Sequence, residues 1–382
     1  MDVNQVLPLL GGLSPAVFMR RHWQKKPLLV RQAWPGVQPP LPRAALFELA
    51  GRDDVESRLV QQRDGRWTVR NGPLPRRALP PASRPGWTLL LQGLDLHDAA
   101  AHTMLQAFRF VPEVRLDDFM VSWASAGAGV GPHTDSYDVF LLQLQGRRRW
   151  RIAPPARAAQ HGQPALVALV AGAPLKLLRD FVPTQEWVLE PGDMLYLPPR
   201  WGHEGTAEGG DCMTGSVGFR APAAGELARE LLLRLAEDDP SERLYRDSTQ
   251  AATACPAAVP AALLDFAREA LARHLAEPDA LPRALGEVLT EPKPSVWFAA
   301  SDDGPAGPGA IVLDRRTRMA YDTRHLFING ESFVASGRDA RLLRGLADTR
   351  RLTQAQRAGL SAGAAELLGE WIQAGWLHAE RA

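Results

Sequence analysis

Apolar and polar residues alternate in short runs from Leu116 to Phe219, and glycine and proline residues separate these runs. Alternation with a period of two is typical of strands, and Gly and Pro mark the turns between strands. Residues 139–144 are almost continuously apolar, which indicates a buried strand. A succession of short strands is what a double-stranded β-helix requires, so we expect such a barrel within a domain of residues 1–222.

Elements of both kinds precede this region. The dipeptide Asp64-Gly65 predicts a hairpin between strands at residues 58–62 and 67–70. Residues 89–91 are three leucines and indicate a buried strand, whereas residues 97–110 have the pattern of a helix. This mixture of helix and strand predicts an α+β fold class.

The composition of the chain changes after residue 222 and becomes rich in Ala, Leu, Glu and Arg. Residues 226–236 and 257–276 have the pattern of helices. Residues 231–233 are all leucine and make the first helix apolar around more of its circumference than one core face needs. We therefore expect residues 223–278 to be a helical dimerisation region of a homodimer, with intramolecular packing alone as the alternative.

Residues 279–382 predict a small domain of their own. Its expected helices and strands lie at residues 281–289, 310–313, 326–328, 339–347 and 362–374. This order suggests a winged-helix-like domain, which invites a DNA-binding interpretation. From Arg315 to Ala382, eleven Arg and Lys residues stand against seven Asp and Glu, and Glu366 and Glu370 occupy the last helix. A groove-reading helix needs cations, so the charges argue against direct nucleic-acid binding and favour a structural or substrate-docking role.

Composition narrows the class of protein further. The 382 residues are 45% hydrophobic and 23% charged with a formal net charge of +1, as in a globular protein without a general attraction to nucleic acid. No apolar stretch approaches the roughly 20 residues of a membrane span, and the first residues lack a signal-peptide pattern. The two cysteines cannot form a disulfide framework. We expect a cytoplasmic protein that does not contact membranes.

The candidate chemistry centres on His133 and Asp135, in the segment Gly-Pro-His-Thr-Asp, and on His203, 68 residues beyond Asp135. Side chains at positions i and i+2 of a strand point to the same side, so a strand would make the first two converge. Two histidines and a carboxylate bind one face of an iron(II) ion and leave the other face open. Residues 378–380 have the same His-x-carboxylate form but lie in a polar tail, so we expect no metal there.

The basic segment of residues 145–152 resolves into two faces if it is a strand. Arg148, Trp150 and Ile152 share one face, and the other arginines share the opposite one. A single arginine that points inward with large apolar residues needs an anion. The far carboxylate of 2-oxoglutarate, whose keto-acid end chelates iron, would supply that anion, and pairing with a protein carboxylate is the alternative.

Further candidates lie on neighbouring segments. Alternation over residues 117–123 places Asp118 and Ser122 on one face, which we take as the barrel interior. Ser122 is then a candidate donor to the cofactor, and Asp118, nearer the rim, offers negative charge to a cationic substrate side chain. Tyr137 would lie on the same side of a strand as His133 and Asp135. Its hydroxyl then faces the cavity, or alternatively its ring fills space in the core. Ser216 is an additional rim candidate.

These segments resemble a known family. The stretches PHTDSYDVFLLQLQGRRRW, EPGDMLYLPPRWGH and GSVGFR are similar to the JmjC group of cupin-fold 2-oxoglutarate oxygenases. With the opening RHWQKKPLLVRQAWPG, they resemble the bacterial ribosomal oxygenases more closely, over nearly the whole chain. The resemblance implies hydroxylation of an arginine side chain of the large-subunit ribosomal protein numbered sixteen, with Fe(II), 2-oxoglutarate and O2.

The resemblance also implies roles for individual residues. These are metal ligation by His133, Asp135 and His203, cofactor contact by Arg148 and Ser122, and substrate contact by Asp118, Tyr137 and Ser216. Many relatives use lysine for the far carboxylate of the cofactor, so an arginine favours the bacterial arginine-hydroxylase branch.

Three functions remain open at this point. The first is the 2-oxoglutarate-dependent hydroxylation of a ribosomal protein. The second is a non-catalytic metal-binding cupin regulator whose C-terminal domain binds nucleic acid and which consumes no 2-oxoglutarate. The third keeps the enzyme and changes its outcome to histidine hydroxylation or lysine demethylation, of which demethylation releases formaldehyde.

Overall fold

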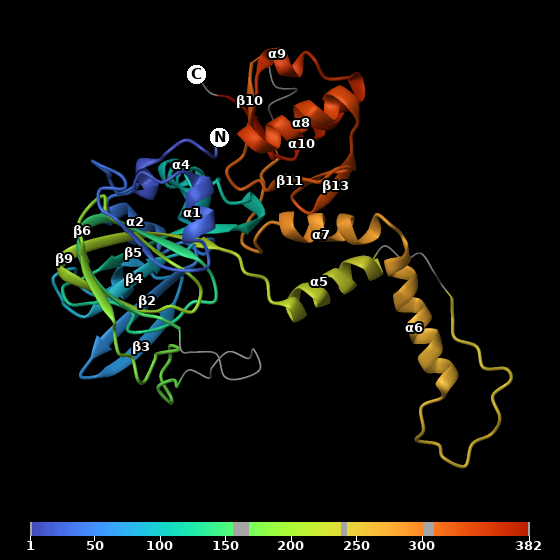
Figure 1. Ribbon diagram of the computed structural model, residues 1–382, viewed down its shortest axis with the longest axis horizontal. Coiled ribbons are helices and arrows are strands. Elements are labelled where there is room, and N and C mark those ends of the chain that lie inside the picture. Colours follow the sequence, from blue (N-terminus) through green and yellow to red (C-terminus); the bar gives the residue numbers. More distant parts are fainter. Residues whose placement is uncertain (1, 156–167, 238–242, 301–308, 381–382) are drawn as a thin grey trace. The chain divides into compact units, whose positions relative to one another are not determined.

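A computed structural model of the protein describes residues 2–155, 168–237, 243–300 and 309–380. The chain divides into two compact units, Met1–Ala221 and Pro222–Ala382 (Figure 1). This boundary lies beside the predicted one at residue 222, and the further division at residue 278 stays a prediction. No helix in the described ranges is long and apolar enough to cross a bilayer.

Unit 1 combines helices with a large sheet. Its helices are α1 (Pro15–Arg21), α2 (Arg43–Leu49), α3 (Leu94–His97) and α4 (Ala99–Gln106), with 3-10 helices at Pro8–Leu10, Arg76–Ala78 and Glu113–Arg115. Its strands are β1 (Leu28–Val30), β2 (Ser57–Arg63), β3 (Arg66–Asn71), β4 (Trp87–Leu91), β5 (Leu116–Ala124), β6 (Val139–Ala153), β7 (Gln185–Leu189), β8 (Met194–Leu197) and β9 (Gly202–Phe219).

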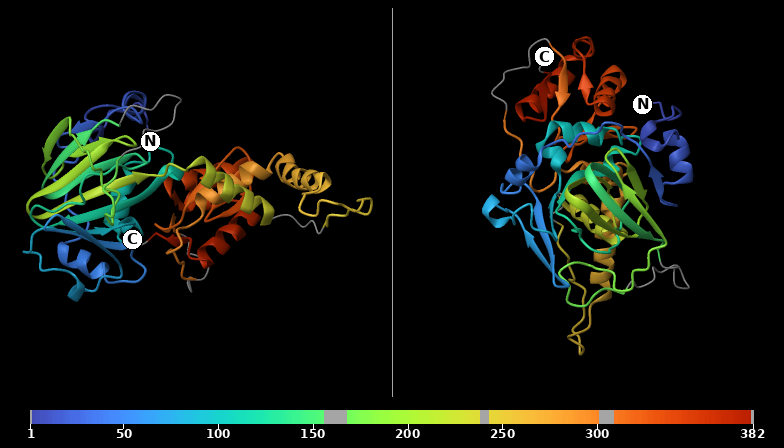
Figure 2. Two further views of the ribbon diagram at one scale, coloured as in Figure 1. Left: turned by 90° about the horizontal axis from the view of Figure 1, so that it is seen from below. Right: turned by 90° about the vertical axis from the view of Figure 1, so that its left-hand side faces the viewer.

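The nine strands of unit 1 form one antiparallel sheet, in the order β1-β8-β6-β9-β5-β4-β2-β3 with β7 paired to β6. Figure 2 shows that the strands curve around a common interior. The predicted hairpin is present as β2 and β3. Asp64 and Gly65 at its tip both have positive φ, as a two-residue turn matched to the strand twist requires.

Strands β6 and β9 are much longer than the short strands expected from the alternation. β6 joins the predicted strand at residues 139–144 to the basic segment, and register shifts between Gln143 and Arg147 interrupt its pairing with β9. Gly146 in this bulge has a φ of +64°. The bulge changes which side chains face inward, because Leu141 lines the interior before it and Arg148 lines the interior after it.

The outer face of the sheet packs against the helices. Phe18 of α1 and Phe47 of α2 lie in one buried cluster with Phe119, Trp123 and Phe140 of the sheet. Since strand side chains alternate, the neighbours of these sheet residues point to the opposite face. That opposite face lines the interior of the barrel.

The helix predicted at residues 97–110 is shorter in the structure, where α4 covers Ala99–Gln106. Asp98 has an extended backbone, and its side chain accepts a hydrogen bond from the Ala101 amide at 2.8 Å. This N-cap begins a new helix, so His97 ends the preceding α3 and does not start α4.

Unit 2 contains six helices and six strands in its described residues. The helices are α5 (Ala224–Glu237), α6 (Ala261–Ala276), α7 (Ala280–Thr290), α8 (Gly337–Thr349), α9 (Gln354–Arg357) and α10 (Ala362–Gln373). The strands are β10 (Ile311–Leu313), β11 (Met319–Tyr321), β12 (His325–Ile328), β13 (Glu331–Val334), β14 (Arg351–Leu352) and β15 (Leu377–Ala379), in the sheets β14-β10-β15 and β11-β12-β13. The prediction of a polar tail around residue 378 is wrong, because this segment forms strand β15, which pairs with β10.

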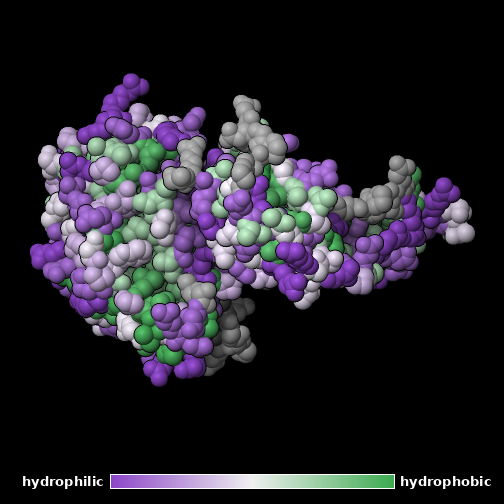
Figure 3. Space-filling view, turned by 90° about the horizontal axis from the view of Figure 1, so that it is seen from above, coloured by the Kyte–Doolittle hydropathy of each residue, from purple (hydrophilic) through white to green (hydrophobic). Residues whose placement is uncertain are grey.

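The leucines of α5 divide between two environments. Leu231 and Leu235 pack on α7. Leu232 and Leu233, in contrast, are 45% and 61% exposed. One face of α5 therefore has an intramolecular partner while adjacent leucines remain at the surface. Figure 3 shows, on the face it presents, apolar residues (green) at the surface among polar ones (purple).

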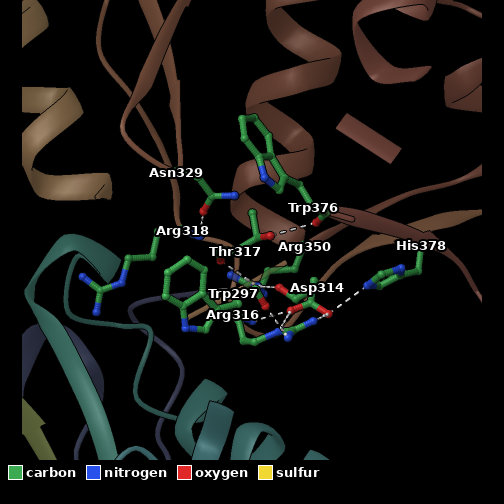
Figure 4. Close-up of polar contacts among 9 residues, drawn as sticks. All are labelled: Trp297, Asp314, Arg316, Thr317, Arg318, Asn329, Arg350, Trp376 and His378. Carbon is green, nitrogen blue, oxygen red and sulfur yellow. Dashed lines mark hydrogen bonds and ion pairs between the residues drawn. The ribbon is translucent and has the colours of Figure 1, made fainter. Parts of the chain in front are cut away.

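A polar network joins β10, α8 and β15 within unit 2 (Figure 4). Asp314 accepts hydrogen bonds from Arg316 Nε at 2.7 Å and from His378 Nε2 at 2.8 Å. The buried Arg350 donates to the backbone oxygens of Asp314 and Thr317. Burial opposes ionisation of Asp314, but the hydrogen bonds from Arg316 and His378 outweigh it and lower the pKa of this carboxyl to about 2.

The Asp314→Asn variant should lose stability in a pH-dependent manner. The ionised carboxylate stabilises the fold above its ordinary pKa of 3.8, and this stabilisation disappears as the pH falls through about 2. We expect a loss of about 2 kcal/mol in unfolding free energy at pH 7 and about half of that at pH 3. Urea denaturation at each pH, with hydrogen exchange of β10 and β15 as the readout, measures this unfolding free energy. Exposed Asp247→Asn is the control, and an equal loss at both pH values would contradict a role for the charge.

Candidate active site

Unit 1 encloses a cavity of about 450 Å³ inside the barrel. Inward side chains of β5, β6 and β9 form much of its wall, and residues 174–177 close one part of it. The cavity brings together all eight residues singled out from the sequence, namely Asp118, Ser122, His133, Asp135, Tyr137, Arg148, His203 and Ser216.

Three of these residues face a single point. Ligand atoms of His133, Asp135 and His203 lie within 4.8 Å of one another, and His203 Nε2 is 3.5 Å from Asp135 Oδ2. Two imidazoles and one carboxylate are the donors that bind one face of Fe(II). No second group of three His, Cys, Asp or Glu side chains with this spacing occurs in the described ranges.

Backbone carbonyls orient both imidazoles. His133 Nδ1 lies 2.9 Å from the Gly131 oxygen, and His203 Nδ1 lies 2.9 Å from the Trp201 oxygen. A carbonyl only accepts, so each Nδ1 carries the proton and each Nε2 keeps its lone pair for a metal. The main chains of the two histidines also exchange hydrogen bonds of 3.0 and 2.9 Å, which holds the two rings side by side.

The metal pair does not lie on a strand, contrary to the expectation from its spacing. Around it the chain forms a single bridge, between His133 and His203, and no continuing ladder. Gly131 has a φ of +77°, and Pro132 has no N–H to donate, so a regular ladder cannot extend back from His133. The ligand atoms of His133 and Asp135 converge nonetheless.

The protonation state of His203 suits metal binding. Burial and the proximity of His133 together lower the pKa of this imidazole to about 4, although the charge of Asp135 acts in the opposite direction. His203 is therefore neutral at neutral pH. Neutral imidazole is the form that binds a metal ion.

Arg148 lies in the same cavity and is only 5% exposed. Its Nη1 donates to Ser122 Oγ at 3.1 Å, whereas Nε and Nη2 are buried without a hydrogen-bond partner. No carboxylate in the described part of the chain pairs with it, so the alternative of a protein partner is not met there. A buried guanidinium with free donors fits an anionic ligand.

The arginines on the outer face of β6 are paired. Arg149 forms ion pairs with Glu186 and Glu208, and Arg151 forms one with Glu204. The alternation read from the sequence is therefore confirmed. It separates the surface arginines of β6, which have protein partners, from Arg148, the one arginine of this strand that faces the cavity.

A second part of the cavity wall carries negative charge. Asp118, expected nearer the rim, is only 6% exposed, and its Oδ2 accepts a hydrogen bond from the Gly93 amide at 2.8 Å. Burial raises the pKa of the Tyr137 hydroxyl, and the charges of Asp135, Asp118 and Asp117 raise it further. Tyr137 therefore stays protonated as a hydrogen-bond donor next to carboxylates.

β2 and β4 contribute cavity residues that were not predicted from the sequence. Arg58 lies on β2 and Gln92 follows β4, and both line the cavity. The alternation of residues 58–62 and 88–92 indicates which side chains of these strands share a face. Nothing in the sequence showed that these strands extend the same sheet as β5.

Comparison with known proteins agrees with this geometry. Residues 103–227 match the JmjC domain family, and residues 272–378 match the ROXA-like winged helix. The chain is 34% identical over 275 residues to the ribosomal protein uL16 3-hydroxylase of Escherichia coli strain K12, which covers 72% of this chain and 70% of that protein. This chain belongs to the JmjC ribosomal oxygenases.

Other ribosomal oxygenases are similar as well. A probable ribosomal oxygenase of Haemophilus influenzae is 34% identical over 233 residues, or 61% of this chain and 56% of that protein. The Escherichia coli ribosomal oxygenase YcfD, solved with cobalt and 2-oxoglutarate, has a TM-score of 0.78 at 28% identity and covers 96% of this chain and 98% of its own. The predicted fold, a JmjC cupin core with a C-terminal winged helix, is confirmed.

Gly129→Ala should weaken metal binding. A Cβ at Gly129 would overlap the backbone oxygen of Gly205, so the turn that carries Gly131 and His133 would have to move away from β9. We expect the affinity for Mn(II) or Co(II), measured by calorimetric titration, to fall about 10- to 100-fold. The control is Gly210→Ala, since a Cβ there meets no atom within 4 Å. Unchanged affinity in both variants would show that the turn does not position His133.

Proposed function

We propose that this protein is an Fe(II)- and 2-oxoglutarate-dependent oxygenase that hydroxylates an arginine side chain of ribosomal protein uL16, the large-subunit protein numbered sixteen. One observation carries the proposal. The group of His133, Asp135 and His203 and the unpaired guanidinium of Arg148 lie in one cavity. A ribosomal substrate implies that the protein acts in the cytoplasm.

The donor sets fit the cofactors. His133, Asp135 and His203 would hold Fe(II) on one face, and Arg148 with Ser122 would hold the far carboxylate of 2-oxoglutarate. When bound, Fe(II), 2-oxoglutarate and O2 supply the oxidation, in which one oxygen atom enters a substrate C–H bond and the other enters succinate as carbon dioxide leaves.

The contribution of the chain is to position the reactants. Arg148 fixes the direction of 2-oxoglutarate because a guanidinium and a carboxylate pair through two parallel hydrogen bonds. The buried side chains of Leu141 and Trp150 line the cavity and exclude water from it. No acid or base residue is needed, so positioning is the main way in which these side chains determine the outcome.

The carboxylates of the cavity wall favour a cationic target. Asp118 offers a buried carboxylate and Tyr137 a protonated hydroxyl, and Ser216 lines the same wall. A guanidinium carries five N–H donors and matches such acceptors, whereas a histidine side chain is neutral near pH 7. Together with the uL16 3-hydroxylase relative, this supports arginine as the residue modified.

Loss of a metal ligand should abolish catalysis. We expect His133→Ala and Asp135→Ala to form no succinate and to leave purified uL16 without the mass increase of one oxygen atom, because two remaining ligands cannot hold the metal tightly. His378→Ala, a histidine outside the cavity, is the matched control and should keep full turnover. Full turnover in the ligand variants would refute the assignment, and formaldehyde release would indicate demethylation.

We also propose that the chain forms a homodimer through α6. Leu264, Leu271 and Leu275 share one face of this helix at positions i, i+7 and i+11 and are 48%, 54% and 52% exposed. No residue of α6 is buried. An apolar stripe of this kind suits a second copy of the same helix.

A charge on this stripe should separate the dimer. Leu271→Glu would place a carboxylate in the apolar contact, and we expect light scattering at micromolar concentration to give a dimer mass for the wild type and a monomer mass for the variant. Ala262→Glu, on the opposite face of α6, should remain dimeric. A wild-type protein that is monomeric at this concentration would contradict the proposal.

A further inference from the structure

Strands β2 and β4 complete the cavity from outside the JmjC match. That match covers residues 103–227, yet Arg58 and Val60 of β2 line the cavity together with Thr88, Leu90 and Gln92 of the β4 segment. Alternation explains their direction, because the residues between them lie in the hydrophobic core on the other face of the sheet. These strands therefore add side chains to the wall of the cavity.

Arg58 is a charged side chain of this added wall. Its Nη2 donates to Gln92 Oε1 at 3.2 Å and lies 3.6 Å from Glu56 Oε1. In the described part of the chain, neither Nε nor Nη1 of Arg58 has a hydrogen-bond acceptor. The side chain is 42% exposed and lines the cavity, so Gln92 holds Nη2 while the N–H groups of Nε and Nη1 remain available as donors.

The charge of Arg58 acts in the same cavity as the carboxylates. Arg58 lines the same cavity as Asp117, Asp118 and Asp135. A cationic target side chain would be attracted by Asp118 and repelled by Arg58. Arg58 is therefore not the residue that binds a cationic target side chain, and its partner must be an acceptor elsewhere on the substrate.

We propose that Arg58, held by Gln92, donates hydrogen bonds to a main-chain carbonyl oxygen of the protein substrate beside the target residue. This inference rests on the proposed function and adds a specificity residue to it. Every residue of a polypeptide offers such an oxygen, and the N–H groups of Nε and Nη1 are donors for it. Arg58 thus binds the substrate chain while the target side chain enters the cavity.

Steady-state kinetics with uL16 test this role. For Arg58→Ala we expect the KM for uL16 to rise about tenfold with kcat within about twofold, because a hydrogen bond from a charged donor at a half-exposed site is lost. The KM for 2-oxoglutarate should not change. Arg58→Lys keeps the charge but not the Nε and Nη1 donors and should give an intermediate KM. The matched control is Arg63→Ala, on the same strand with a side chain 91% exposed.

The KM values decide whether Arg58 binds the substrate chain. An unchanged KM for uL16 in Arg58→Ala, while the wild type is active, would overturn this inference and leave the proposed function intact. A rise in the KM for 2-oxoglutarate would overturn it as well, since Arg58 would then act through the cofactor. If the wild-type protein, loaded with Fe(II) and 2-oxoglutarate, neither binds nor hydroxylates uL16, the proposed function fails and this inference fails with it.

Discussion

The burial of one positive charge without a protein counter-charge is the constraint on which the site depends. Removing a guanidinium from water costs several kcal/mol unless an anion compensates it, and Arg148 has only the hydroxyl of Ser122 as a hydrogen-bond partner among the described residues. The other arginines of β6, Arg149 and Arg151 among them, lie on the outer face of the sheet and form ion pairs with glutamates. An anion bound in the cavity beside the metal ligands would compensate the buried charge of Arg148.

The bulged strands β6 and β9 bring this charge and the metal ligands together. Ile152 pairs with His203 across the two strands, and Arg148 lies on the same face of β6 as Ile152. Without the bulge near Gly146, the inward parity of Leu141 would continue and Arg148 would point outward. The register of one strand pair thus sets where a dicarboxylate keto acid can reach both a metal and a guanidinium.

Part of this arrangement could be predicted from the sequence, because it depends on local periodicity. Alternation identified Arg148 as the inward arginine, and residue type identified the metal ligands. The broken ladder at Gly131 could not be predicted, since spacing does not reveal a positive φ. Nor could the position of Arg58, because the neighbours of β2 in the sheet depend on contacts distant in the sequence. The expected polar tail at His378 failed for the same reason, since its partner strand is β10.

The most direct test of the account compares two ligands that differ in one group. 2-Oxoglutarate and 2-oxopentanoate share the keto-acid end, and only the first has a far carboxylate. Calorimetric titration without oxygen into the Mn(II)-loaded protein should show 2-oxoglutarate binding about 100-fold more tightly, a difference that disappears in Arg148→Met. Equal affinities of the wild-type protein for both acids would contradict the role of the buried guanidinium and the account built on it.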